Sequence, residues 1–166
     1  MAPKVVLVGP MGAGKTTVAA MLGEAWDLPV RDTDADIETA EGRSISDIFV
    51  DDGEDHFRSL ETRAVADALA THDGVLALGG GAVLRPETRE LLVGLPVVFL
   101  RVGLSEAVKR VGLGVGRPLL LGNVRARIKA LLDERTPVYE SVAAQVVETD
   151  GRTADEVAAE VRRLVG

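Results

Sequence analysis

The segment best equipped for chemistry is a glycine-rich stretch near the N-terminus. Residues 9–16 read Gly-Pro-Met-Gly-Ala-Gly-Lys-Thr and fit the P-loop pattern G-x-x-x-x-G-K-[ST]. Glycines let the backbone approach closely, so that consecutive N–H groups and the N-terminus of the following helix converge on phosphate oxygens. Lys15 can then bridge the terminal phosphates, and Thr16 offers a hydroxyl to Mg²⁺. The alternative is a turn whose glycines serve only packing, but the apolar run at residues 5–8 and the helix-favouring segment after the loop favour a triphosphate site.

Two carboxylates and a run of three glycines are further candidates. Beside a Mg²⁺-triphosphate site, Asp32 and Asp34 could divide the work, one positioning metal-bound water and the other orienting an attacking hydroxyl. The alternative is that both only cap the helix that follows them. Gly79-Gly80-Gly81 comes directly after a short apolar run, and by itself this segment could equally be an ordinary loop.

Several arginines have an ordinary explanation as well as a chemical one. A planar guanidinium matches a carboxylate or a phosphate in shape and in charge. Read alone, Arg58 is a surface residue or a partner of Glu61, Arg117 is a loop cation, and Arg135 compensates a helix dipole. The residues by themselves leave both interpretations open.

Composition limits the class of protein. The chain has 166 residues, 46% of them hydrophobic, which suits one domain with a core of its own, and it has no cysteine for disulfides or thiolate metal sites. A net charge of −7 argues against nucleic acid as the main partner. Residues 101–135 nevertheless hold eight Lys and Arg against three Asp and Glu, which predicts either a solvated helix face or a surface that frames a small anion. The first apolar run is far too short for a signal peptide or a membrane span, so we expect a cytoplasmic protein.

Strands and helices alternate along the whole chain. Short buried strands are expected at residues 5–8, 30–33, 75–78, 97–102 and 142–148. Helices are expected at residues 15–26, 34–41, 44–50, 54–71, 86–93, 105–111 and 124–135, with a last one opened by a capping box at residues 153–156. This alternation implies an α/β fold with a parallel sheet covered by helices on both faces.

Some expected boundaries rest on single residues. Ser105 is the expected N-cap of its helix, and Pro137 is expected to break the basic helix that starts at about residue 124. Residues 112–122 alternate glycine with apolar residues around Arg117, which is typical of a mobile flap. Ligands gather at the carboxyl ends of parallel strands, so the P-loop, the two aspartates, the three glycines and the flap should meet there.

Taken together, these motifs resemble the shikimate kinase family over nearly the whole chain. The matching segments are residues 9–17, Asp32-Thr33-Asp34, Ile37-Glu38, Gly42-Arg43-Ser44-Ile45, Ile48-Phe49, Gly53-Glu54, Phe57-Arg58, Glu61, Gly79-Gly80-Gly81, Arg117-Pro118-Leu119 and Arg135-Thr136-Pro137-Val138-Tyr139. The resemblance implies a three-layer P-loop kinase fold, with a five-stranded parallel sheet, helices on both faces and a mobile lid. It implies one kinase domain over residues 1–166, a lid at approximately residues 112–124 and a substrate-binding segment at approximately residues 32–62.

The resemblance also implies an activity, which is ATP-dependent phosphorylation of the 3-hydroxyl of shikimate in aromatic amino-acid biosynthesis, with Mg²⁺ as the metal. Asp34 would be the base or orienting acceptor, while Lys15 and Arg117 would lie on the transferring phosphoryl group. The nucleotide would be bound by Gly12, Ala13, Gly14, Lys15, Thr16, Thr17, Arg110, Arg117 and Arg152. Of these, Arg110 and Arg152 would flank the adenine. Shikimate would be bound by Asp34, Arg58, Gly79, Gly80, Gly81 and Arg135, and Mg²⁺ by Thr16 and, through water, by Asp32.

Two other functions stay open at this point. Another small-molecule or nucleotide kinase would share the P-loop and the flap, although paired carboxylate-binding arginines disfavour it. A nucleotide-dependent switch or binding module would need guanine recognition of the Asn-Lys-x-Asp type, yet the only asparagine is Asn123 and no Asp-x-x-Gly occurs. We expect shikimate and ATP as partners, no nucleic acid, no membrane, and a monomer.

Overall fold

Five parallel strands form the centre of the computed structural model. The structure describes the backbone of residues 2–115 and 121–166, and the side chains of residues 2–110 and 124–166. The strands are β1 (Val5–Val8), β2 (Val30–Asp32), β3 (Val75–Ala77), β4 (Val97–Arg101) and β5 (Gln145–Glu148). Their order across the sheet is β2-β3-β1-β4-β5, and each neighbouring pair is parallel. The strand that leads into the P-loop is therefore the central one.

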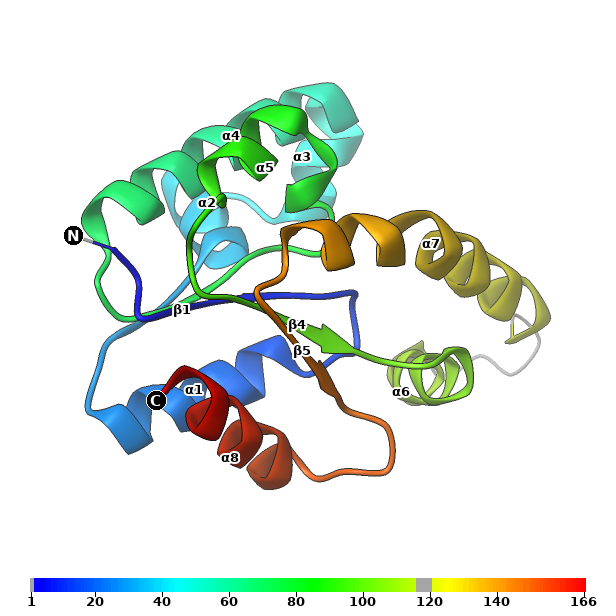
Figure 1. Cartoon of the computed structure of the whole chain (residues 1–166). Helices are drawn as coiled ribbons and strands as arrows, with labels where there is room; N and C mark the ends of the chain where they lie inside the picture. Colours follow the sequence, from blue (N-terminus) through cyan, green and yellow to red (C-terminus); the bar gives the residue numbers. More distant parts are fainter. Residues whose placement is uncertain (1, 116–120) are drawn as a thin grey trace.

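Helices cover both faces of the sheet, as Figure 1 shows. They are α1 (Lys15–Trp26), α2 (Thr33–Glu41), α3 (Ile45–Asp52), α4 (Glu54–Thr71), the short 3₁₀ helix η1 (Ala82–Leu84), α5 (Pro86–Leu91), α6 (Leu104–Val115), α7 (Leu121–Val142) and α8 (Ala154–Val165). One core cluster joins one sheet face to α1 and α8, and a second joins the other face to α4 and the end of α7. The three-layer arrangement predicted from the sequence is confirmed.

The central strand is buried on both sides. Alternate side chains of a strand point to opposite faces, so Val5 and Leu7 belong to the core under α1 and α8, whereas Val6 and Val8 belong to the core under α4 and α7. None of the four is more than 1% exposed, and burying a side chain of this size stabilises the fold by about 1.5–3 kcal/mol. The P-loop thus starts from one of the most firmly packed positions in the molecule.

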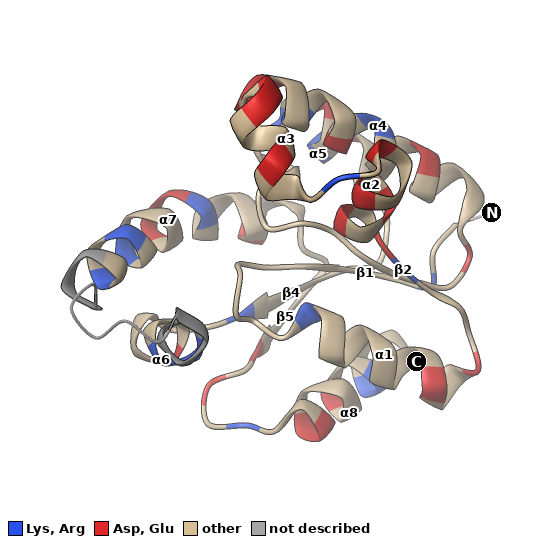
Figure 2. Cartoon of the chain, turned by 180° about the vertical axis from the view of Figure 1, so that it is seen from behind, with Lys and Arg blue, Asp and Glu red and all other residues tan. Residues whose placement is uncertain are grey.

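The basic segment has two different parts. Figure 2 colours several Lys and Arg positions blue along the ribbon of α7, and Arg125, Arg127 and Lys129 in its first half are exposed. Arg110 on α6 and Arg135 on α7 are only partly exposed and line cavities. The solvated-face interpretation is therefore right for the first group, whereas the second group lies where it can meet an anion.

The prediction that Pro137 breaks a helix is wrong. Helix α7 runs from Leu121 to Val142 with Pro137 inside it. Proline lacks the N–H that would bond the carbonyl four residues earlier, at a cost of about 3 kcal/mol. Beyond it, however, Tyr139 is fully buried and Val142 packs against the same core, so their burial offsets that loss.

Ser105 is not the N-cap of its helix. Helix α6 begins at Leu104, and the N–H of Ala107 donates to the carbonyl of Gly103 at 2.9 Å. The carboxylate of Asp150 accepts the N–H of Gly103 at 3.0 Å, and the helix starts two residues earlier than a cap at Ser105 would place it.

Other boundaries move for comparable reasons. The strand expected from residue 142 begins at Gln145, because residues 142–144 continue or follow α7, and a short apolar run does not distinguish strand from helix. Thr33 belongs to α2 rather than to β2, and η1 was not predicted. The ends of the expected lid are helical, since α6 reaches Val115 and α7 starts at Leu121, while residues 116–120, Arg117 among them, lie outside the described residues.

No helix in the described part of the chain combines the length and apolar character that a membrane span needs.

Candidate active site

The P-loop forms a phosphate-sized cradle at the carboxyl end of β1. Gly12 and Gly14 have φ angles of 86° and 89°, a left-handed conformation that side chains other than glycine rarely adopt. The residue before α1, Gly14, provides no side-chain cap, so the first N–H groups of this helix stay open to an anion. The ammonium of Lys15 donates to the carbonyls of Gly9 at 2.5 Å and Pro10 at 3.1 Å.

The protein groups around Lys15 disfavour the charged form of its side chain. The pKa of the Lys15 ammonium is lowered to about 8, mainly by burial; Asp34 and Asp32 oppose this shift, and the charge of Arg135 adds to it. A polyphosphate in the cradle would supply the negative charge that this lysine lacks. The site is therefore prepared for an anion.

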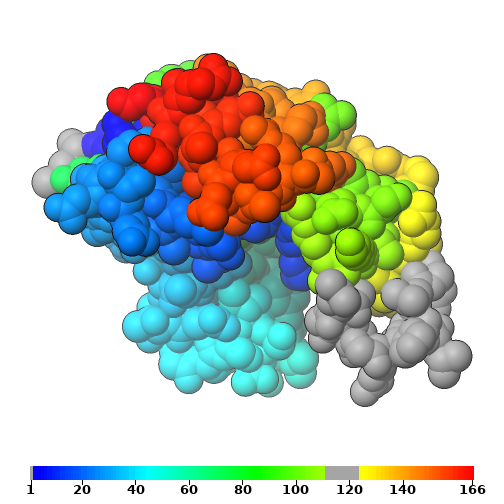
Figure 3. All heavy atoms as spheres, turned by 90° about the horizontal axis from the view of Figure 1, so that it is seen from below, coloured from blue at the N-terminus to red at the C-terminus, as the bar shows by residue number. Residues whose placement is uncertain are grey.

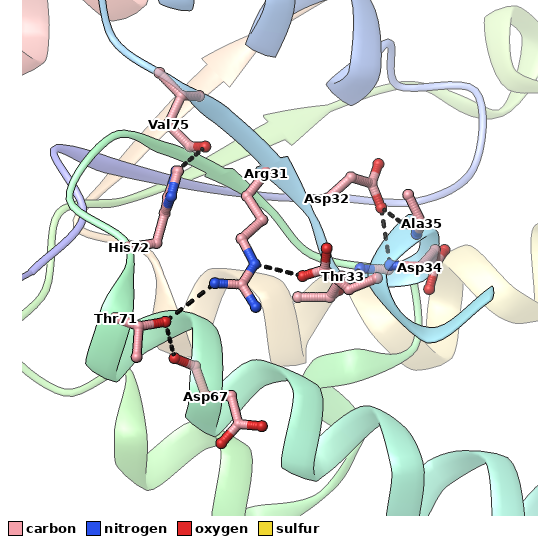
Figure 4. A network of polar contacts seen from close by, with 11 residues as sticks. Arg31, Asp32, Thr33, Asp34, Ala35, Asp67, Thr71, His72 and Val75 are labelled. Carbon is pink, nitrogen blue, oxygen red and sulfur yellow. Dashed lines mark hydrogen bonds and ion pairs between the residues drawn. The ribbon is translucent and has the colours of Figure 1, made fainter. Parts of the chain in front are cut away.

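The two aspartates at the end of β2 and the start of α2 have different surroundings. Figure 4 shows one carboxylate oxygen of Asp32 accepting the N–H groups of Asp34 and Ala35, at 2.8 Å and 3.3 Å, which caps α2. The capping alternative is thus observed for Asp32, whose second oxygen takes no part in these bonds. Asp34 lies in the first turn and partly buried; burial and then the nearby charge of Asp32 raise its pKa, while Lys15 opposes the shift.

Arg31 fixes the orientation of α2. From β2 its Nε donates to Oδ2 of Asp36 at 2.6 Å, and its Nη1 donates to the hydroxyl of Thr71 at the end of α4 at 3.1 Å (Figure 4). Helix α2 is in this way held between the sheet edge and α4. The position of Asp34 consequently depends on three elements rather than on one.

Helix α4 carries a buried ion pair into the site. Nη1 of Arg58 lies 2.7 Å from Oε1 of Glu61, and the two side chains are 13% and 3% exposed. Burial raises the pKa of Glu61, although hydrogen bonding to Arg58 opposes this. Arg58 is thus a partner of Glu61, which was one of the two interpretations of this arginine from the sequence. It also lines the cavity beside the P-loop. Sequence reasoning did not place Glu61 among the site residues, but an acid between Phe57 and Val65 on the buried face of an amphipathic helix was an available signal.

Two of the three glycines, Gly79 and Gly81, lie closer to charged groups than an ordinary loop residue could. A Cβ atom at Gly79 would lie 2.5 Å from Oδ1 of Asp34 and 2.9 Å from Oε2 of Glu61. At Gly81 it would lie 2.5 Å from Nη2 of Arg58. Real Cβ atoms do not tolerate such distances, so only glycine leaves room for the charged groups that gather around this backbone.

A cavity of about 650 Å³ collects these groups. Its lining residues that bear charge or carry the predicted chemistry are Gly12, Gly14, Lys15, Thr16, Thr17, Asp32, Asp34, Glu54, Arg58, Glu61, Gly80, Gly81 and Arg135. Apolar walls come from Met11, Ile45, Phe49, Phe57, Leu78 and Leu131. In Figure 3 the atoms of α3 and α4 (cyan) stand apart from those of α6 (green), which gives the molecule a hollow on this side. Gly79 lies behind the wall, bonded to Thr33 at 3.3 Å.

A second cavity, of about 300 Å³, lies on the other side of the P-loop. It is lined by Gly12, Ala13, Gly14, Thr17, Val18, Glu106, Arg110, Thr149, Arg152, Ala154 and Val157. Nη1 of Arg110 donates to the carbonyl of Gly12 at 2.7 Å, and Nη1 of Arg152 donates to that of Glu148 at 2.9 Å. The structure thus brings both arginines beside the phosphate cradle, away from Asp34 and Arg58.

One further cavity is as large but has another character. It measures about 670 Å³ and lies between α5 and the end of α7, and its charged lining residues are Arg89 and Glu90. Arg89 is already engaged, since its Nη1 donates to the carbonyls of Val83 and Leu84 at 2.9 Å. The convergence of phosphate-binding backbone, carboxylates and arginines belongs to the cavity at the P-loop.

The donors at that cavity suit Mg²⁺. Mg²⁺ keeps several waters and usually takes one or two protein oxygens together with substrate phosphates. Thr16 has an exposed hydroxyl beside the cradle, and Asp32 has a carboxylate oxygen that does not cap α2. Among the described residues there is no cluster of three or more His, Cys, Asp or Glu that could hold a metal ion. The donor set fits a metal that arrives with phosphates better than a resident ion.

Comparison with known proteins gives one consistent result. A model of the shikimate kinase family matches residues 11–165. The chain is 58% identical over 165 residues to the shikimate kinase of Salinispora arenicola, covering 99% of both chains. It is 56% identical over 156 residues to that of Streptomyces coelicolor, covering 94% of this chain and 91% of the relative.

Solved structures agree with these relatives. The shikimate kinase from Acinetobacter baumannii in complex with shikimate matches with a TM-score of 0.90 and 35% identity, covering 99% of this chain and 93% of that one. The shikimate kinase from Aquifex aeolicus matches with a TM-score of 0.84 and 29% identity, covering 96% and 94%.

Proposed function

The chain belongs to the shikimate kinase family, and we infer that it transfers the terminal phosphoryl group of ATP to the 3-hydroxyl of shikimate, giving shikimate 3-phosphate and ADP. One observation carries this conclusion beyond the family: a single cavity holds Lys15 at the phosphate cradle, Asp34 beside it, and the two guanidinium groups of Arg58 and Arg135. A polyol carboxylate and a triphosphate need just these partners.

We propose that the nucleotide spans both cavities around the P-loop. The phosphates would lie on the N–H groups of residues 12–17 and on Lys15, because the uncapped start of α1 and its dipole favour anions. The base would lie near Arg110 and Arg152 in the second cavity. Arg117 remains a proposal from the sequence alone, as a cation that meets the transferring group.

Mg²⁺ would be held by Thr16 directly and by Asp32 through water. The metal supplies neutralisation of phosphate charge when it is bound. The cap that Asp32 makes on α2 keeps its carboxylate at a fixed place, so metal and substrate positions would be linked through one residue.

Asp34 would be the proton acceptor for the hydroxyl of shikimate. A carboxylate in a partly buried site, with its pKa raised by burial, is a better proton acceptor than one in water, provided that it is ionised at the working pH. It faces Gly79 and lies near the charge of Lys15. The attacking oxygen would thus lie between the acceptor and the phosphate cradle.

Arg58 and Arg135 would bind the carboxylate of shikimate. A guanidinium presents parallel N–H groups that match a carboxylate in geometry as well as charge. Glu61 holds Arg58 from behind, and Nη1 of Arg135 lies 3.7 Å from the place of a Cβ atom at Gly80. The glycine backbone would complete this end of the shikimate site.

We also propose that residues 1–166 work as one kinase domain, with a lid at about residues 112–124 and a substrate segment at about residues 32–62. The lid proposal rests on the sequence. The domain would act as a monomer in the cytoplasm, where ATP is available, without nucleic acid.

The direct test is release of ADP from ATP in the presence of Mg²⁺, with and without shikimate. Release that depends on shikimate supports the function, and Lys15→Ala should remove it while leaving the fold intact. ATP turnover by the wild type that is independent of shikimate, or none at all, would contradict it.

A further inference from the structure

The backbone of Gly79–Gly81 is tied on both sides by buried hydroxyl groups. On one side the N–H of Gly79 donates to Oγ1 of Thr33 at 3.3 Å. On the other side the hydroxyl of Tyr139 donates to the carbonyl of Gly80 at 2.5 Å. Both side chains are fully buried, so water does not compete for these bonds.

Each of these hydroxyls belongs to the element that carries a substrate group. Thr33 directly precedes Asp34 on α2, and Tyr139 follows Arg135 by one turn on the same face of α7. The glycine segment therefore links the carboxylate at one end of the cavity to the guanidinium at the other. Its length fixes the separation between them.

We propose that Tyr139 is a positioning residue for the acceptor: its hydroxyl, through Gly80, sets the distance between Arg135 and Asp34 and so selects a substrate whose carboxylate and hydroxyl have the matching separation. This inference rests on the proposed function. Tyr139 is not among the residues that line the cavity, so we expect it to contact neither substrate nor phosphate. It acts through the carbonyl of Gly80 and through its closeness to Arg135, whose charge and hydrogen bonding both oppose the rise in the pKa of the Tyr139 hydroxyl.

The surroundings of Tyr139 suit a fixed donor. Its ring centroid lies 5.0 Å from that of Phe99, in a tilted pair within the core. Burial raises the pKa of the Tyr139 hydroxyl, although the charge of Arg135 opposes this, so the hydroxyl keeps its proton. Removing only the oxygen should leave the ring packed and the carbonyl of Gly80 without its donor.

Arg135 needs such external positioning. Its Nε is buried and has no hydrogen-bond partner among the residues that the structure describes. Its guanidinium lies beside Gly80, where Nη1 is 3.7 Å from the place of a Cβ atom. The placement of this arginine thus depends on how α7 sits against the glycine backbone, which is what the Tyr139 bond determines.

The test is Tyr139→Phe in the full chain, with KM and kcat measured for both substrates. Loss of one buried hydrogen bond should raise the KM for shikimate by about tenfold, whereas the KM for ATP should change less than about twofold. Ser141→Ala is the matched control, since it removes a hydroxyl on the same helix that donates to the carbonyl of Val138 at 2.6 Å and not to a glycine of this segment. It should leave both KM values unchanged.

Two readouts separate positioning from general loss of structure. The preference for shikimate over its methyl ester, as the ratio of kcat/KM values, should fall about fivefold or more in Tyr139→Phe. The same substitution should have little further effect in an Arg135→Ala background, because both residues act on one contact. A variant that is merely less stable would lose activity without changing either quantity.

The outcomes are distinguishable from failure of the proposed function. Shikimate phosphorylation by the wild type with an unchanged shikimate KM and ester preference in Tyr139→Phe would overturn the positioning role and leave the kinase activity standing. No shikimate phosphorylation by the wild type would overturn both. If Tyr139→Phe does not fold, Thr33→Val decides by the same criteria, since it releases the other end of the glycine segment.

Discussion

The carboxylate of Glu61, whose side chain is 3% exposed, lies 2.7 Å from Nη1 of Arg58 and holds that guanidinium against Gly81, where a Cβ atom would lie 2.5 Å from Nη2 and 2.6 Å from Nη1. Glu61→Gln should therefore free Arg58 from its position. Removing one partner of a buried charged pair costs about 2–5 kcal/mol, so kcat/KM for shikimate should fall roughly 30-fold or more. Steady-state kinetics measures this.

Glu54 is the matched control for Glu61. It lies 3.5 Å from Nη2 of the same arginine, but its side chain is 61% exposed, and exposed pairs contribute little. Glu54→Gln should leave kcat/KM within about twofold of the wild type. Equal losses in both variants would mean that burial of the pair does not position Arg58.

Binding of ATP should be coupled to protonation of Lys15. In the free protein, burial lowers the pKa of this ammonium to about 8, and bound phosphates must raise it again. Above that pH the lysine has to gain a proton on binding, so ATP affinity should fall as pH rises, by at most about tenfold per unit. Calorimetry in two buffers with different ionisation enthalpies measures the proton uptake.

Lys15→Met removes the titrating group and provides the control. Its ATP affinity should be lower throughout and nearly independent of pH over the same range. A wild-type dissociation constant that stays flat from about pH 7 to 9.5 would show that Lys15 does not change its protonation on binding.

Asp34→Asn should separate activity from stability. The pKa of Asp34 is raised in the folded protein, mainly by burial, so its contribution to the unfolding free energy is largest at low pH and is lost as pH rises through the folded pKa. At neutral pH the asparagine variant should unfold at a higher denaturant concentration than the wild type, although its turnover falls roughly 10²-fold or more.

The control for Asp34 lies two residues away on the same helix. Asp36 forms an ion pair with Arg31 at 2.6 Å, so Asp36→Asn removes a favourable contact and should not raise stability. Denaturant unfolding at mildly acidic and neutral pH compares the three proteins. A stabilisation of equal size in both variants would indicate a general effect of lower negative charge rather than one at the site.

Arg135→Ala should weaken recognition of the carboxylate. The shikimate KM should rise far more than the ATP KM, and lysine should rescue only in part, because an ammonium cannot form the planar fork. Shikimate methyl ester should be a poor substrate for the wild type and lose little further in the variant. An ester that still shows the full difference would assign Arg135 another role.

The sequence specified the local chemistry well where one motif dictates one geometry. The P-loop, its strand and α1 fall at the predicted residues, and so does α4, because glycine spacing and a long amphipathic period each have one structural solution. The strand order could not be read, since it depends on contacts between residues far apart in the chain. The prediction that Pro137 ends the helix was wrong because burial of Tyr139 and Val142 outweighs the local helix-breaking effect of proline.

At the site, it was easier to predict which residues line the cavity than which groups they contact. Asp32 and Arg58 each combine the structural role, as cap and as partner of Glu61, with a place in the cavity wall. The structural interpretation and the chemical one are therefore compatible for both residues. The bond from Tyr139 to Gly80 depends on packing between α7 and the glycine segment, which a linear pattern does not encode, whereas the helical spacing around Glu61 did carry a signal for its burial.

The central claim is that one cavity joins ATP to the 3-hydroxyl of shikimate. The most direct measurement is to incubate the protein with ATP, Mg²⁺ and shikimate and to locate the phosphate in the product by phosphorus–proton correlation NMR. The account predicts equal amounts of ADP and of a product whose phosphorus couples to the proton on carbon 3, and neither with Lys15→Ala. Phosphate on another oxygen, or ADP formed without a phosphorylated shikimate, would contradict it.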